Sequence, residues 1–201
     1  MVTHIIITII FALTLKSSNG QFTGAVDYTG GHDLVTKSFT LYQGGTLLYK
    51  MANPKAITFF ISNSGTVFAC NEKFLYVYDP TGRVSLIKEL NYPNGFAFSP
   101  DNSLFFASDI NGLFAFANAG ELVYEVNPCR LFSSTSDGDE IVTISMDTLY
   151  VYEKGILKYQ RLLKTLYTRT ISIMNEESIK VEEPSVIELF NLNTGEKLEE
   201  H

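Results

Sequence analysis

The sequence has no tryptophan, only two cysteines and only three histidines among its 201 residues. Two cysteines, Cys70 and Cys129, are too few for a disulfide scaffold. We interpret Cys70 as a small buried residue, and we expect no bridge between the two, because they fall in repeats that are not adjacent. The histidines, His4, His32 and His201, lie far apart in the chain and show no metal-ligand spacing. Phosphate-binding glycine loops, nucleophile elbows and paired-cysteine motifs are also absent. The residues alone therefore predict no catalytic residue, no cofactor and no metal site.

Positive charge is scarce as well. Lysine and arginine together number 15 against 22 aspartates and glutamates, which gives a formal net charge of −7 and a pI near 5.0. A surface of this sign repels phosphate backbones, so we expect no nucleic-acid partner.

No apolar run is long enough to form a stable membrane span. The longest covers residues 5–15, whereas a spanning helix needs about twenty apolar residues. This run has the length of the apolar core of a signal peptide, and Ser18 and Gly20 supply small residues for a cut before Gln21. We expect residues 1–20 to be a signal peptide and the protein to enter the secretory pathway. The alternative is a buried strand that closes a ring of repeats, in a cytoplasmic protein.

What the sequence does contain is phenylalanine (15), tyrosine (11) and an internal repeat. Flat and β-branched side chains favour strands. The third repeat is the clearest, with apolar segments at 95–99, 103–107, 112–116 and 121–126 separated by polar turns. The other four repeats are expected at 24–28, 33–36, 38–42 and 46–51; at 57–61, 66–70, 74–78 and 83–90; at 130–134, 140–145, 148–152 and from 156; and at 170–174, 178–181, 185–190 and 196–200.

Glycine and proline mark the same repeat. One glycine precedes each fourth segment, where a tight hairpin turn needs a positive φ. These glycines are Gly45, Gly82, Gly120, Gly155 and Gly195. Prolines such as Pro54, Pro93 and Pro128 fall in the links between repeats, because proline cannot donate to a β-ladder.

Four strands in each unit of about 40 residues are typical of a propeller, in which neighbouring sheets bury each other's faces. We therefore predict an all-β fold, a β-propeller of about five four-stranded antiparallel blades, over residues 22–201. Five blades are near the lower limit for a closed ring. A further alternative is an incomplete propeller that another chain or a homodimer completes.

Two stretches resemble known propeller families. Residues 94–101 followed by 104–108 resemble the first two strands of WD-repeat propellers, and 186–197 resembles their third strand and following turn. The resemblance covers residues 22–200, although no Trp-Asp pair ends a third strand. It implies that Asp109 and Asp147 fix the backbone between second and third strands.

The segment Tyr92-Pro93-Asn94-Gly95 resembles gluconolactonase-type propellers. That resemblance implies that Asn94 binds a divalent metal together with an acidic residue of an early blade, such as Asp27, and one of a later blade, Asp137 or Asp139. The alternative, which we favour, is that Asn94 and Gly95 only turn the chain.

Residues 154–169 carry five basic side chains, and the apolar residues among them fall at helical spacing. The segment predicts either a longer fourth strand followed by a solvated loop or a short basic amphipathic helix.

For function, we predict a non-enzymatic interaction or scaffold domain that binds a protein partner through its loops, with Tyr42, Tyr92 and the Asn-Pro links on the binding surfaces. The alternatives are a metal-dependent lactonase built around Asn94 and a secreted lectin-like propeller that binds sugars between blades.

Overall fold

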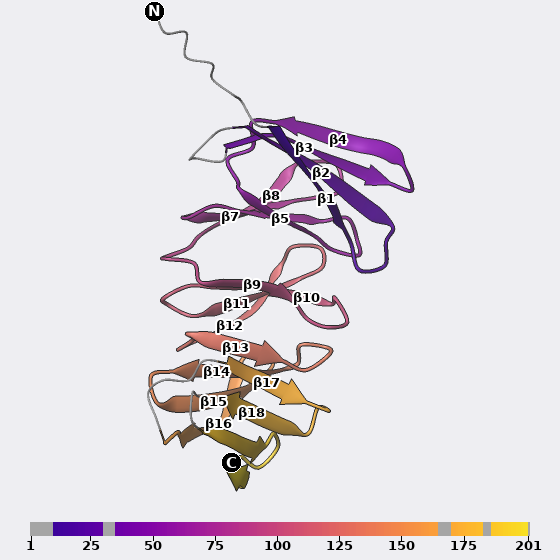
Figure 1. Ribbon diagram of the computed structural model, residues 1–201. Helices are drawn as coiled ribbons and strands as arrows, with labels where there is room; N and C mark the ends of the chain where they lie inside the picture. The colour runs from indigo at the N-terminus through magenta and orange to yellow at the C-terminus, as the bar shows by residue number, and fades with distance from the viewer. Residues whose placement is uncertain (1–9, 30–34, 165–169, 183–185, 201) are drawn as a thin grey trace, which may run out of the picture. The chain divides into compact units, whose positions relative to one another are not determined.

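The computed structural model of the protein describes residues 10–29, 35–164, 170–182 and 186–200 (Figure 1). These residues form 20 strands in five four-stranded sheets, and each sheet consists of four consecutive antiparallel strands in chain order. Over this part of the chain no helix is long and apolar enough to cross a bilayer. The sheets belong to two compact units, an N-terminal unit (Met1–Glu89) and a C-terminal unit (Leu90–His201).

The N-terminal unit holds two sheets. The first consists of β1 (Ile10–Lys16), β2 (Phe22–Thr29), β3 (Val35–Gln43) and β4 (Thr46–Ala52). The second consists of β5 (Thr58–Ile61), β6 (Val67–Cys70), β7 (Phe74–Tyr78) and β8 (Val84–Glu89).

The C-terminal unit holds three sheets. The third sheet consists of β9 (Gly95–Phe98), β10 (Leu104–Ser108), β11 (Leu113–Ala117) and β12 (Leu122–Val126). The fourth consists of β13 (Leu131–Ser134), β14 (Glu140–Ser145), β15 (Thr148–Glu153) and β16 (Ile156–Leu162). The fifth consists of β17 (Thr170–Met174), β18 (Ser178–Glu182), β19 (Ile187–Asn191) and β20 (Lys197–Glu200).

The strands predicted for the second to fifth repeats are confirmed to within about two residues, but the assignment of the first repeat was wrong. Its first strand is β1, inside the segment expected to be a signal peptide, and β1 pairs with β2 over seven residue pairs from Ile10↔Thr29 to Lys16↔Thr23. The expected separate strand at 33–36 does not form: β3 begins at Val35, and residues 30–34 lie outside the described residues. Residues 10–15 of the apolar run satisfy their backbone groups by pairing with β2. Cleavage of residues 1–20 stays a prediction.

The basic segment after Lys154 begins as a strand. β16 runs for seven residues, which confirms the longer fourth strand up to Leu162. The remaining part of the proposed helix, residues 165–169, lies outside the described residues.

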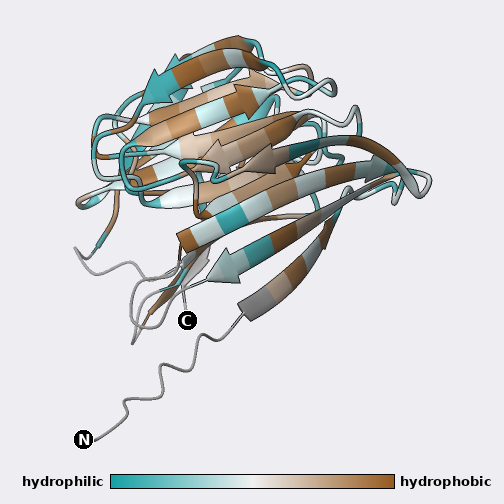
Figure 2. Ribbon diagram, turned by 90° about the horizontal axis from the view of Figure 1, so that it is seen from above, coloured by the Kyte–Doolittle hydropathy of each residue, from teal (hydrophilic) through white to brown (hydrophobic). Residues whose placement is uncertain are grey.

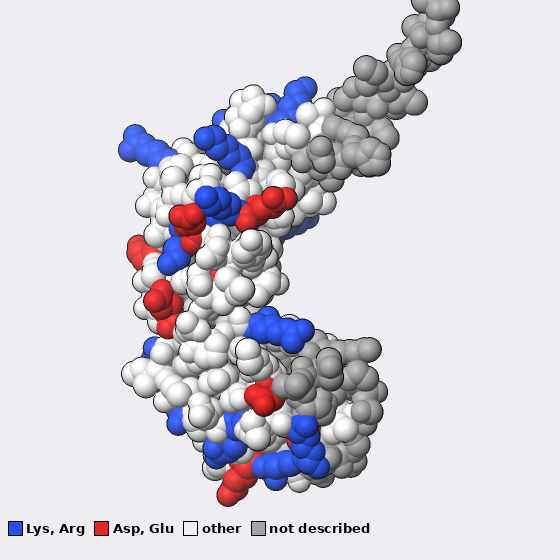
Figure 3. Space-filling view, turned by 90° about the vertical axis from the view of Figure 1, so that its left-hand side faces the viewer, with Lys and Arg blue, Asp and Glu red and all other residues white. Residues whose placement is uncertain are grey.

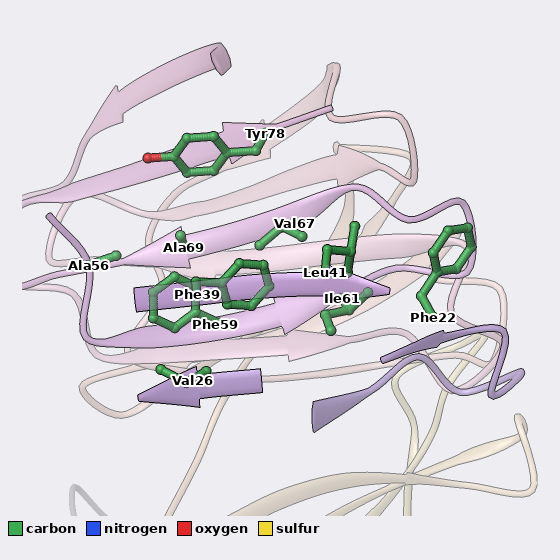
Figure 4. Close-up of a cluster of buried hydrophobic side chains, with 10 residues drawn as sticks. All are labelled: Phe22, Val26, Phe39, Leu41, Ala56, Phe59, Ile61, Val67, Ala69 and Tyr78. Atoms are coloured by element: carbon green, nitrogen blue, oxygen red, sulfur yellow. The ribbon is translucent and has the colours of Figure 1, made fainter. Parts of the chain in front are cut away.

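Facing side chains of the first and second sheets form the core of the N-terminal unit (Figure 4). Phe39 of β3 and Phe59 of β5 stack with their ring centroids 4.7 Å apart, at an interplanar angle of 13°. Val26 and Leu41 from the first sheet meet Val67 of the second, and all three are fully buried. Each sheet alone would leave this apolar face in water, so the two sheets stabilise each other.

The three sheets of the C-terminal unit pack in the same way. Phe106 and Leu113 of the third sheet meet Ile141 of the fourth, while Val151 of the fourth meets Ile179 of the fifth. Apolar and polar residues alternate along many strands, as the bands of Figure 2 show, because successive side chains point to opposite faces.

One irregularity recurs in every sheet. The register between the third and fourth strands shifts once, and the fourth strand contributes one extra residue there. The extra residues are Leu48, Ser85, Val123, Lys158 and Leu198. A β-bulge twists an outer strand and makes it a poor template for pairing with another chain.

Candidate interaction surfaces

Each sheet has two chemically different ends, which follow from its strand order. At the turn end, turns join the first strand to the second and the third to the fourth. At the link end, a turn joins the second strand to the third, and the chain passes to the next sheet. Consecutive sheets are therefore connected covalently only at their link ends.

The first turn of four sheets is closed by the same hydrogen bond. A Ser or Thr oxygen accepts the backbone N–H that begins or precedes the second strand, at 3.0–3.1 Å. The pairs, donor first, are Phe22–Ser17, Thr66–Ser62, Leu104–Ser99 and Glu140–Thr135. Two residues further on, a polar side chain bonds the same hydroxyl, as Asp101 does to Ser99 at 2.7 Å. These turns satisfy their own backbone groups locally.

Hydrogen bonds also join the first turns of neighbouring sheets. In the N-terminal unit, the Asn19 amide N–H donates to Asn63 Oδ1 at 2.9 Å. In the C-terminal unit, the Asp101 N–H donates to the Ser136 carbonyl, and the Ser136 N–H donates to Glu176 Oε1, both at 2.9 Å. Because no covalent link exists at this end, these bonds hold the edges of the sheets together.

Tyrosines make a second contact between sheets at the turn end. The side chains of Tyr49, Tyr124 and Tyr159 lie against the turn glycine of the following sheet, and a Cβ on that glycine would lie 2.5–2.8 Å from the nearest atom of the tyrosine side chain. The partner glycines are Gly82, Gly155 and Gly195, respectively. The repeat glycine therefore has two functions, a positive φ of 68–83° and room for an aromatic ring.

Charge differs sharply between the turn ends of the two units. In the C-terminal unit, the described turn segments carry a single basic residue, Lys154. These segments are residues 99–103, 118–121, 135–139, 154–155, 175–177 and 192–196. Their carboxylates are Asp101, Glu121, Asp137, Asp139, Glu176, Glu177 and Glu196. In the N-terminal unit, the corresponding segments carry two charged residues, Asp79 and Arg83. These segments are residues 17–21, 44–45, 62–66 and 79–83. The turn end of the C-terminal unit is therefore acidic, whereas that of the N-terminal unit is neutral.

Asp109 organises the link end of the third sheet. The side chain is 1% exposed; Oδ1 accepts the N–H groups of Asn111 (2.7 Å) and Gly112 (3.0 Å), and Oδ2 accepts that of Asn91 (2.8 Å). The Ile110 N–H in turn donates to the Asn91 carbonyl at 3.0 Å. The carboxylate thus ties the turn after β10 to the link before β9, as the WD-repeat resemblance implied. Asp147 makes only one such bond, from Thr148 Oγ1 at 3.0 Å.

Four large apolar side chains protrude at the link end of the C-terminal unit, and each is between 67% and 80% exposed. They are Tyr92, Ile110, Met146 and Leu162, and we call this set the link-end surface. Tyr92 (φ 55°) and Met146 (φ 54°) have left-handed backbone conformations, which few side chains adopt without strain. On the face drawn in Figure 3, wide uncharged areas separate scattered charges of both signs.

The residues that the gluconolactonase resemblance implied for a metal site do not come together within the C-terminal unit. Asn94 lies at a link end, and its amide oxygen accepts the Ser108 hydroxyl at 2.5 Å. Asp137 and Asp139 lie at a turn end, a strand length away, which is on the order of 13 Å. Asp27 belongs to the other unit, where its carboxylate accepts the Ser38 hydroxyl at 2.7 Å. Among the described residues, no group of three or more His, Cys, Asp or Glu could hold a metal ion.

Both cysteines are buried and free of a disulfide. Burial was predicted for Cys70, and the absence of a bridge was predicted for the pair. Burial raises the pKa of the Cys70 thiol to about 12, and burial together with the Asp109 charge does the same for Cys129, so neither is a nucleophile at neutral pH. Tyr92 is exposed as expected, but Tyr42 lies near the turn end of its sheet and belongs to a different surface. The three histidines lie outside the described residues.

Sequence reasoning missed the link-end surface and the contacts at the turn end. Two signals could have found the latter. Gly-x-x-x-Tyr occurs in three repeats, beginning at Gly45, Gly120 and Gly155, and Ser/Thr-x-Asx occurs in three first turns, beginning at Ser17, Ser99 and Thr135. The link-end surface has no such pattern: Ile110 and Met146 lie in equivalent turns, between the second and third strands of their sheets, but they differ in type, and Tyr92 and Leu162 come from other positions.

Comparison with known proteins supports the architecture. The chain is similar to the crystal structure of BamB from Moraxella catarrhalis, with a TM-score of 0.53, over 96% of this chain and 74% of that one, at 10% sequence identity. The fold is an all-β propeller of about five blades. No family model matches the chain, and no curated protein matches its sequence. Membership of the WD-repeat or gluconolactonase-type families stays a prediction.

Proposed function

We propose that the protein is a non-enzymatic propeller domain that binds a protein partner through the link-end surface of its C-terminal unit. The observation that carries the proposal is the set of four large apolar side chains, Tyr92, Ile110, Met146 and Leu162, exposed at one end of the unit. Large apolar side chains exposed at one end of a domain are typical of interaction sites, and aromatic residues are enriched among those that contribute most to binding.

The backbone beneath these side chains supports the same conclusion. The Asp109 carboxylate holds Asn91, Asn111 and Gly112, so the segments that carry Tyr92 and Ile110 are fixed relative to each other before any partner arrives. Near Met146, the Leu163 N–H donates to the Asp147 carbonyl at 2.7 Å and fixes the end of β16. A preorganised surface binds more tightly because less conformational entropy is lost on association.

The first step of the test is site-specific cross-linking in cells. A photo-reactive amino acid replaces Tyr92 or Met146, and a control replaces Ile156, which is as exposed as Met146 (74%) but lies at the turn end of β16. We expect the same partner to be cross-linked from positions 92 and 146 and not from 156.

The second step measures affinity with that partner in purified form. Tyr92→Ser and Met146→Ser should each weaken binding at least about tenfold, whereas Ile156→Ser should change it less than about twofold. Equal affinities for all three variants would refute the proposal. Circular dichroism confirms that each variant is folded.

A further inference from the structure

A cavity lies at the turn end of the C-terminal unit, opposite the link-end surface and between the third and fourth sheets. It has a volume of about 360 Å³. Its lining consists of Ser103, Leu104, Val123, Tyr124, Asp137, Asp139 and Lys154. This volume is near the lower limit of cavities that hold a drug-sized molecule, so it suits a single long side chain.

The cavity is amphipathic, with an apolar wall formed by Leu104, Val123 and Tyr124. Gly138, between the two aspartates, leaves room for Leu104, because a Cβ at Gly138 would lie 2.8 Å from Leu104 Cδ1. The Tyr124 hydroxyl donates to the Gly138 carbonyl at 2.6 Å and fixes the ring against the turn.

The charged groups of the cavity are two carboxylates and one ammonium. Lys154 Nζ lies 2.9 Å from Asp139 Oδ2, in a pair whose side chains are 64% and 46% exposed. Asp137 Oδ1 accepts the Thr135 hydroxyl at 2.8 Å and the Asp139 N–H at 3.0 Å. No ion pair of Asp137 exists within the described residues. Lys154 therefore pairs with Asp139, and the Asp137 carboxylate can pair with a second cation.

We infer that this cavity binds an Arg or Lys side chain of a basic segment of a partner protein. The aliphatic part of such a side chain would lie on the apolar wall, and its charged end would reach Asp137. The surrounding turn end carries seven carboxylates and one lysine, so it attracts a segment of positive charge. Lys154 competes with the incoming cation, because an exposed ion pair of this kind is weak and readily exchanged.

The inference is tested by NMR titration of the ¹⁵N-labelled full chain with acetyl-arginine amide and with acetyl-citrulline amide, its uncharged isostere. We expect saturable shifts of the Val123 and Asp139 amides with the arginine compound only. Equal responses to both compounds, or no saturable response, would overturn the inference.

Three variants separate the cavity from the general acidity of the surface. Asp137→Asn keeps an oxygen that accepts the hydrogen bonds of the turn but removes the charge, and it should weaken binding at least about threefold. Glu177→Gln makes the same change of charge at the same end but outside the cavity, and it should have less than about a twofold effect. Lys154→Met should strengthen binding about threefold, because it removes the competing cation.

Each variant has an outcome that contradicts the inference. Equal losses in Asp137→Asn and Glu177→Gln would show that only the overall surface charge acts. Weaker binding by Lys154→Met would show that the lysine belongs to the binding site and does not compete for it. The link-end variants Tyr92→Ser and Met146→Ser should leave the titration unchanged, so failure of the proposed function and failure of this inference are distinguishable.

Discussion

The two ends of the C-terminal unit differ in how neighbouring sheets are joined. At the link end the chain itself connects consecutive sheets, and the carboxylate of Asp109 fixes the local backbone. At the turn end no covalent connection exists, and hydrogen bonds between turns and tyrosine rings packed on glycines take its place. Because the chain itself joins the sheets at the link end, apolar side chains there can be exposed without loss of the connection. At the turn end, side chains and turns are needed for the contacts between sheets. We therefore expect most substitutions at the turn end to change stability and those of the link-end surface to change binding.

Asp109→Ala should give the largest loss of folding stability among these variants. This loss would show that Asp109 stabilises the link end. It leaves three backbone N–H groups without their charged acceptor, which should lower the free energy of unfolding by about 3 kcal/mol. Urea unfolding followed by circular dichroism measures the change. Asp147→Ala is the control, with an expected loss of about 0.5 kcal/mol, because it removes a single part-buried hydrogen bond among the described residues, from the Thr148 hydroxyl. Similar losses in both variants would contradict this account of the link end.

Gly82→Ala tests the packing of tyrosine on glycine at the turn end. Gly82 and Gly45 have nearly the same φ, 83° and 84°, but a Cβ at Gly82 would lie 2.8 Å from the Tyr49 ring, whereas Gly45 has no atom within 4 Å. Backbone strain alone should cost about 1 kcal/mol in Gly45→Ala, and the added overlap should raise the cost to about 2–3 kcal/mol in Gly82→Ala. Equal unfolding free energies for the two variants would mean that the glycines are required only for φ.

Removal of single tyrosine hydroxyls compares two turn-end contacts of the same geometry. Tyr124 donates to the Gly138 carbonyl, whereas the buried Tyr49 hydroxyl has no hydrogen-bond partner among the residues that the structure describes. Tyr124→Phe should therefore lose about 1 kcal/mol, and Tyr49→Phe should be neutral or slightly stabilising. Thermal unfolding of the two variants gives the difference, and a loss in Tyr49→Phe equal to that in Tyr124→Phe would show that Tyr49 has a partner in solution.

The smallest expected effect is the loss of folding stability that follows protonation of Asp137 at acidic pH. Hydrogen bonds from the Asp139 amide and the Thr135 hydroxyl hold the pKa of Asp137 below its ordinary value. Because the folded pKa is lower than the unfolded one, this stabilisation is complete above about pH 4 and is lost as the pH falls through the lowered value. The side chain is exposed, so the contribution should be below about 0.5 kcal/mol.

Asp137→Asn cannot be protonated in this range, so its stability should vary less than that of the wild type between about pH 4 and pH 2. Unfolding by urea at both pH values measures the difference. Glu177→Gln is the control, because no side-chain hydrogen bond ties Glu177 among the described residues. A pH dependence of Asp137→Asn identical to that of the wild type would contradict the assignment.

Strands of four repeats could be predicted because an apolar run and a turn glycine are both local signals. The assignment of the first repeat was wrong because its first strand is apolar over residues 10–15 except at Thr14, a pattern that a signal peptide shares. Pairing with β2 is a property of the folded chain, and no local signal in residues 5–15 distinguishes it from a targeting segment. Asp109 was predicted as structural through its place in the repeat. Asn94 fits the motif of a metal ligand, but in the structure its oxygen is occupied by Ser108.

The order of apolar runs, glycines and prolines was enough to determine that this chain forms five four-stranded sheets, because strand and turn preferences act between neighbouring residues. Only the tertiary structure decided which side chains meet at the ends of the sheets. Tyr92 and Met146 are separated by more than fifty residues of sequence and Leu104 and Lys154 by fifty. A surface or cavity made of such residues exists only after antiparallel strands have brought their ends together, so the preferences of neighbouring residues do not determine its chemistry.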